Sequence, residues 1–150
     1  MPKIPYKNKA MKINTLLIVA ALLAGLTSCG GDHLCYTPIG PTNFSIEPNS
    51  ASYSNLNHVG GYLYLTGGHR GVVVVRTGLD EFVAYERTCP NDSTTAVEIS
   101  ADYGEAILEC PECHSLFSVY ADGAPMNGNV SPCPLYKYST TYDGRDLWVY

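Results

Sequence analysis

Short apolar runs separated by turn-forming residues follow one another along the chain from position 44 onward. Most of these runs are rich in β-branched and aromatic residues, a composition typical of strands. The run Val72–Val75 is continuously apolar, as expected of a strand that is buried on both faces. The pattern predicts strands at residues 44–47, 62–65, 72–75, 82–85, 96–100, 106–109, 116–120, 135–141 and 147–150.

Helical signals are weak in the same part of the chain. No segment after residue 30 repeats apolar residues with the period of an amphipathic helix, and there is no internal repeat. The pairs Asp122-Gly123 and Asp143-Gly144 supply residues that tight turns between strands require. The 14 glycines, 10 prolines and 12 tyrosines among 150 residues fit the same interpretation. The sequence therefore predicts an all-β fold, either a small antiparallel sandwich or a partly open barrel.

The N-terminal segment has a different pattern, typical of a secretory signal peptide. Four lysines precede the apolar run Leu16–Leu26, and these 11 residues are too few to cross a bilayer core of ~30 Å as a helix. The run ends at Leu26-Thr27-Ser28-Cys29, which resembles the lipobox of bacterial lipoproteins. That resemblance implies that Cys29 is lipidated and becomes the first residue of the mature protein. An ordinary signal peptide is the alternative, and translation can start at Met1 or at Met11.

These segments predict a signal peptide at 1–28, a lipidated tether at 29–43 and a β domain at 44–150. Residues 1–28 hold four of the nine basic residues and none of the 14 acidic ones, so the remainder carries a formal charge of −9. This charge leaves no basic face for nucleic acid. We expect an extracytoplasmic, membrane-anchored lipoprotein on the periplasmic or outer-membrane face, where disulfides persist. Its expected partners are the membrane, through the lipid anchor, and an unidentified protein.

Cysteines carry the candidate chemistry of the predicted domain. The turn Cys110-Pro111-Glu112-Cys113 presents two sulfurs on one side of a tight loop, which suits a tetrahedral metal ion. Cys89 and Cys133 also lie next to prolines at the ends of predicted strands. Cys35 falls in the tether, and its position there predicts a spacer residue. A single Cys-x-x-Cys turn is a moderate signal, because a typical structural zinc site uses two of them.

The chain from about Gly60 to Tyr150 resembles the Rieske domain family. In that family, two loops each deliver one cysteine and one histidine to a [2Fe–2S] cluster. Residues 86–91 match the first loop at Cys89, and residues 110–117 match the second loop at its cysteine, proline and phenylalanine. The segments 128–134 and 143–149 are similar to the proline loop and terminal hairpin of the family. The resemblance implies a Rieske-like fold in which the two cysteine loops lie side by side.

The ligand positions depart from the family pattern. Asn91 stands where the first histidine is expected, Cys113 where the second is expected, and His114 replaces a glycine. Cys89 and Cys110 are 21 positions apart, slightly more than is usual. An amide is a poor iron ligand, so the standard cluster with two cysteines and two histidines cannot be built from these positions. The resemblance in fold therefore does not bring the function with it.

Three interpretations of the cysteine loops remain open. In the first, the protein is non-enzymatic and a disulfide joins Cys89 to Cys110 or Cys113, because the family places those loops together. In the second, these three cysteines and either Cys133 or His114 form an altered metal site. Zinc or no metal is favoured there over an iron–sulfur cluster, which would transfer single electrons at roughly −400 mV. In the third, Cys113 or Cys110 exchanges disulfides beside His114.

Overall fold

The computed structural model of this chain describes residues 35–126, 128 and 130–150. The predicted signal peptide and the lipidation site at Cys29 lie outside these residues. Within the described part, no helix is both long and apolar enough to cross a membrane.

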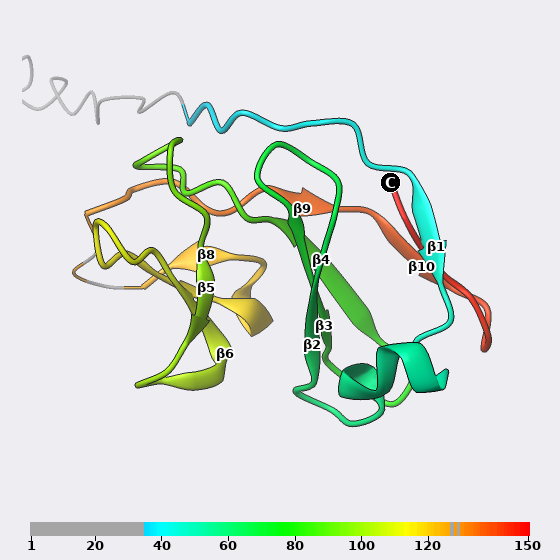
Figure 1. Cartoon of the computed structure of the whole chain (residues 1–150). Coiled ribbons are helices and arrows are strands. Elements are labelled where there is room, and N and C mark those ends of the chain that lie inside the picture. The colour runs from blue at the N-terminus through cyan, green and yellow to red at the C-terminus, as the bar shows by residue number, and fades with distance from the viewer. Residues whose placement is uncertain (1–34, 127, 129) are drawn as a thin grey trace, which may run out of the picture. The chain divides into compact units, whose positions relative to one another are not determined.

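The described residues form an all-β fold, as predicted, in three open antiparallel sheets (Figure 1). The first sheet contains, in spatial order, β1 (Phe44–Ile46), β11 (Leu147–Val149) and β10 (Thr140–Tyr142). The second contains β2 (Tyr62–Leu65), β3 (Val72–Arg76), β4 (Phe82–Glu86) and β9 (Lys137–Tyr138). The third contains β5 (Glu98–Ser100), β6 (Gly104–Glu109), β7 (Leu116–Ser118) and β8 (Ala124–Pro125). None of these described sheets closes into a barrel.

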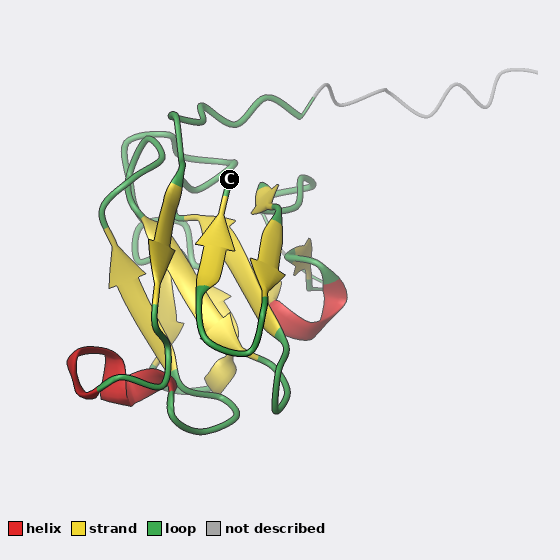
Figure 2. Cartoon of the chain, turned by 90° about the vertical axis from the view of Figure 1, so that its right-hand side faces the viewer, coloured by secondary structure: helices red, strands yellow, loops and turns green. Residues whose placement is uncertain are grey.

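The second sheet is the middle layer of the fold. Its strand β3 is fully buried on both faces, which confirms the prediction made from its unbroken run of valines. Val73 and Val75 pack in the core shared with the third sheet, whereas Val72 and Val74 pack in the core shared with the first sheet. Figure 2, which looks onto β1, β11 and β10, shows the second sheet behind them. The two cores therefore lie on opposite sides of β3.

Each predicted strand overlaps an observed strand, but two of them change within their predicted range. The strand predicted at 116–120 ends at Ser118, and the chain continues as the 3₁₀ helix η3 (Val119–Ala121). The strand predicted at 135–141 is two strands, because Tyr138 pairs with Ala84 in the second sheet while Ser139 bonds to Tyr150 beside the first. A second 3₁₀ helix, η2 (Ala51–Leu56), and the two-residue strand β8 were not predicted.

The loops at one end of the third sheet carry the cysteines. One loop joins β4 to β5 across residues 87–97, and the other joins β6 to β7 across residues 110–115. The side chain of Tyr85, in β4, supports this end of the fold because it is fully buried and its hydroxyl donates to the carbonyl of Val119 at 2.7 Å. Burial, with the nearby charge of Asp122, raises the pKa of Tyr85 to about 12, so the hydroxyl remains a donor.

Candidate metal centre

The first loop holds Cys89 by main-chain hydrogen bonds. The amide of Cys89 donates to the carbonyl of Thr95 at 2.9 Å, next to a β-bridge between Thr88 and Ala96. At the tip, the carboxylate of Asp92 accepts hydrogen bonds from the amide of Thr94 at 3.0 Å and from two threonine hydroxyls. This Asx-type turn fixes the loop without an apolar core of its own. The Cys89 side chain is fully buried as a result.

The second loop is a single tight turn that carries Cys110 and Cys113. The amide of Cys110 donates to the carbonyl of Ser115 at 3.0 Å, and the amide of His114 donates to the carbonyl of Cys110 at 2.9 Å. His114 has a φ of 54°, in the left-handed region that favours glycine. The family pattern has a glycine at this position, so the two observations agree on the shape of the turn.

The two loops bring three sulfur atoms together. The Sγ atoms of Cys89, Cys110 and Cys113 all lie within 4.8 Å of one another, and those of Cys89 and Cys113 are 3.7 Å apart. Two thiolates on one tetrahedral zinc ion, with Zn–S bonds of ~2.3 Å, lie about 3.8 Å apart. Cys89 and Cys110 are fully buried, whereas Cys113 is half-buried. The arrangement has the dimensions of a site for one metal ion with one partly open side.

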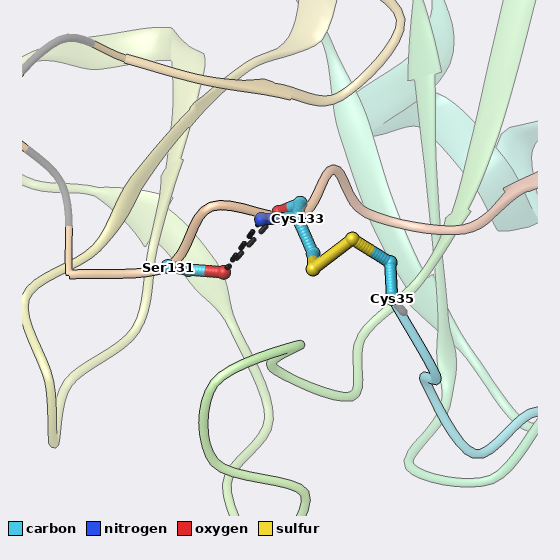
Figure 3. The surroundings of a disulfide bond; sticks show 3 residues. All are labelled: Cys35, Ser131 and Cys133. Carbon is cyan, nitrogen blue, oxygen red and sulfur yellow. Dashed lines mark hydrogen bonds between the residues drawn. A yellow bond between two sulfur atoms is a disulfide. The ribbon is translucent and has the colours of Figure 1, made fainter. Parts of the chain in front are cut away.

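The disulfide of the described chain lies elsewhere, between Cys35 and Cys133 (Figure 3). The pairing expected from the family resemblance is not formed in this structure, in which Cys89, Cys110 and Cys113 are free thiols. Cys133 is consequently not available as a fourth metal ligand, and the interpretation of Cys35 as a spacer is wrong. No signal in the sequence singled out Cys35, because five cysteines after Cys29 allow any one of them to remain unpaired.

The other candidate ligands do not reach the three sulfurs. The ring Nδ1 of His114 lies 3.3 Å from a carboxylate oxygen of Glu109, and its side chain is 75% exposed. Asn91 is exposed on the first loop. Among the described residues, the group of potential ligands at this end contains only the three cysteines. A fourth ligand would therefore come from water or from another molecule.

Ser115 is a site residue that the sequence did not reveal. Its buried hydroxyl lies 3.2 Å from the sulfur of Cys113 and also accepts the amide of Ser131 at 3.1 Å. The Cys113 thiol donates to this oxygen, and when Cys113 is a thiolate the serine hydroxyl can donate to the sulfur instead. Ser115 thus positions Cys113 and ties the loop before Cys133 to the cysteine turn.

The three thiols differ in acidity. Burial, with the neighbouring Cys110 thiol, raises the pKa of Cys89 to about 12, and burial also raises the pKa of Cys110. Burial acts upward on Cys113 too, but hydrogen bonds from the hydroxyl and amide of Ser115 outweigh it and lower the pKa of this thiol. In the metal-free protein, Cys113 is therefore the first of the three to become a thiolate.

The segment around the disulfide is connected to this site. The hydroxyl of Ser131 donates to the carbonyl of Cys133 at 3.2 Å and lies 3.3 Å from its amide nitrogen, as Figure 3 shows. The amide of Ser131 in turn donates to Ser115 beside Cys113. The Cys35–Cys133 bond thus holds a loop that supports the cysteine turn from behind.

Comparisons with known proteins give similarity to solved structures alone, since no protein-family model and no curated protein matches this chain. The ferredoxin of carbazole 1,9a-dioxygenase from Nocardioides aromaticivorans IC177 is 23% identical, with a TM-score of 0.43, over 61% of this chain and 86% of that chain. A complex of reduced oxygenase and oxidized ferredoxin in carbazole 1,9a-dioxygenase is similar at 22% identity and a TM-score of 0.47, over 70% of this chain and 91% of that chain.

Proposed function

We propose that this chain is a non-enzymatic, lipid-anchored protein whose Rieske-like domain binds one thiophilic metal ion, of the zinc class, at Cys89, Cys110 and Cys113. The observation that carries the proposal is the meeting of three free sulfurs from two loops within 4.8 Å. Thiolates are soft ligands that select zinc, copper(I) or iron–sulfur clusters over magnesium and calcium. Burial of two of the three sulfurs excludes competing water from most of the site.

The [2Fe–2S] cluster implied by the family resemblance does not fit these residues. Such a cluster takes two protein ligands on each of two irons, so its ligands fall into two separated pairs. Of the two positions that would form the second pair, one holds an exposed Asn91 and the other holds Cys113, and the neighbouring His114 points outward. Cys133, the other candidate, is used in the disulfide. Three sulfurs grouped around one point favour a mononuclear centre instead.

Binding of zinc requires all three cysteines as thiolates, so metal uptake releases protons. The ion supplies a redox-inactive positive charge that joins the two loops. Ser115 holds the sulfur of Cys113 in place, and the main-chain bonds of the 110–115 turn hold Cys110. The half-buried side of the site, at Cys113, is where a water or a group from another molecule would complete the coordination.

The membrane anchor is a separate part of the proposal. It rests on the lipobox-like residues 26–29, and we propose an extracytoplasmic location with a protein partner that presents a basic face. Mass spectrometry of protein extracted from membranes is expected to find acyl groups on an N-terminal Cys29. Cys29→Ser is expected to move the protein to the soluble fraction. An unmodified N-terminus at another residue would contradict the anchor and would leave the metal site unaffected.

The metal proposal is tested on the full chain with Cys29 replaced by serine, so that no further thiol is present. We expect one zinc ion per chain by elemental analysis and by competition with a chelator. Cys110→Ser should weaken zinc binding by more than ~100-fold, because even loss of an outer-shell partner costs ~10–100-fold. His114→Asn is the matched control, since asparagine tolerates the left-handed φ at this position, and its zinc affinity should be unchanged.

Two outcomes would contradict the single-ion site. A brown protein with two irons per chain would make it an iron–sulfur electron carrier. A protein that binds neither zinc nor iron while all three thiols react with a thiol reagent after unfolding would make it metal-free. Loss of zinc in His114→Asn would show that the histidine, despite its outward position, is a ligand.

A further inference from the structure

We infer that Cys89 and Cys113 form a reversible second disulfide by thiol–disulfide exchange, and that this closure releases the metal ion. The metal-release part rests on the proposed function, whereas the exchange itself rests on the geometry of the free thiols. The two sulfurs come from different loops and lie 3.7 Å apart. A disulfide needs them at ~2.05 Å, so the loops have to approach by less than ~2 Å.

Accessibility decides which thiol reacts first. Cys89 and Cys110 are fully buried, and Cys113 is the half-buried member of the three. A disulfide-bearing molecule outside the protein can therefore be reached by Cys113 alone. Cys89, in contact with Cys113, lies behind it as the second thiol.

Exchange proceeds in two balanced steps, with a small or protein disulfide as the oxidant. The Cys113 thiolate attacks one sulfur of that disulfide, which forms a mixed disulfide and releases one thiolate of the oxidant. The Cys89 thiolate then attacks the sulfur of Cys113, which forms the Cys89–Cys113 bond and releases the second thiolate. Two protein thiols are oxidised, and one disulfide of the oxidant is reduced to two thiols.

The third thiol, that of Cys110, is fully buried, so an outside disulfide does not reach it first. Cys110 is fixed by main-chain bonds at both ends of its turn, to Ser115 and to His114. Its sulfur lies within 4.8 Å of the other two, and Cys89 is in contact with the accessible Cys113 at 3.7 Å. Oxidation thus removes two of the three ligands and leaves Cys110 as the single sulfur ligand, which is too few to retain the ion.

The test treats the full chain carrying Cys29→Ser with oxidised glutathione, both metal-free and loaded with zinc. Peptide mapping is expected to find the Cys89–Cys113 disulfide, and a zinc indicator should record the loss of one ion per chain. Cys89→Ser should stop at glutathione attached to Cys113, and Cys113→Ser should not react. Cys110→Ser is the matched control and should still form the Cys89–Cys113 bond.

The outcomes separate this inference from the proposed function. A map that places the new bond at Cys110, or thiols that react after unfolding but not in the native protein, would overturn the inference even if zinc binds. Formation of the Cys89–Cys113 bond in a protein that never binds zinc would support the thiol–disulfide exchange. The same result would contradict both the release of metal and the proposed zinc-binding function.

Discussion

Replacing Glu86 with glutamine is expected to lower the free energy of unfolding by about 3 kcal/mol or more. The carboxylate of Glu86 is fully buried and accepts five hydrogen bonds at 2.6–3.0 Å. Its donors are the amides of His69, Arg70 and Thr88 and the hydroxyls of Thr88 and Tyr138. Glutamine keeps one acceptor oxygen and turns an NH₂ group toward donors, so several buried donors lose their partner. Each such loss costs ~1–3 kcal/mol.

The same carboxylate makes stability depend on pH. Burial acts to raise the pKa of Glu86, but the hydrogen bonds from His69, Arg70, Tyr138 and Thr88 outweigh it and lower the pKa below its ordinary value of 4.5. A lowered pKa in the folded state gives stability that is fully present above the unfolded pKa and is lost as pH falls through the folded pKa. We therefore expect wild-type stability to decline below about pH 4.5, and Glu86→Gln to lack this contribution.

Denaturant unfolding of both proteins at pH 7 and in the acid range measures these two effects. Glu98→Gln is the control, because the Glu98 side chain is 63% exposed and its ion pair with Arg87 is long, at 3.5 Å. This variant should change stability by less than ~1 kcal/mol. A Glu86→Gln protein as stable as the control would mean that the donors find other partners.

Removal of the Cys35–Cys133 disulfide is expected to cost about 4 kcal/mol. The bond joins residues separated by 98 positions, and the chain-entropy treatment gives ~4.7 kcal/mol for a loop of about 100 residues. The effect acts chiefly on the unfolded chain, which gains freedom once the loop opens. Cys35→Ser combined with Cys133→Ser should show this loss in denaturant unfolding.

A reductant supplies the matching control for the disulfide. It should lower the stability of the wild-type protein by about the amount that the double substitution does, and it should leave the double variant unchanged. If the reductant lowered the stability of both proteins equally, the Cys35–Cys133 disulfide would contribute little to the free energy of unfolding, and another effect of reduction would dominate.

Local patterns predicted much of the fold, because a strand's composition is visible within its own residues. The valine run of β3 and the aromatic run of β2 are examples, and both lie where they were expected. The division of the predicted strand 135–141 into β9 and β10 at Ser139 could not be read from the sequence. It depends on which neighbouring strand each residue pairs with. Likewise, η2 has the sequence ASYSNL, which carries no helical apolar period.

The candidate site divides in the same way between what is local and what is not. The Cys110–Cys113 turn could be recognised from four consecutive residues, and Cys89 was added to the predicted site because of the family resemblance. The partner of Cys133 lies 98 positions away, and the donors to Glu86 come from segments on either side of it, so only tertiary structure could reveal them. Ser115 is another example, because its importance comes from contacts with Cys113 and Ser131.

The position of the Cys35–Cys133 disulfide also limits the distance between the β domain and the membrane. Cys35 is bonded to Cys133 in the domain, so the residues between Cys35 and β1 do not lengthen the tether. Only the residues between the proposed lipid at Cys29 and Cys35 do. Six residue steps separate Cys29 from Cys35 and span at most about 21 Å, against about 42 Å for the 12 steps to Pro41, whose carbonyl accepts a hydrogen bond from the amide of Gly68 at 3.3 Å. Severing the disulfide would therefore roughly double the protein's reach above the membrane.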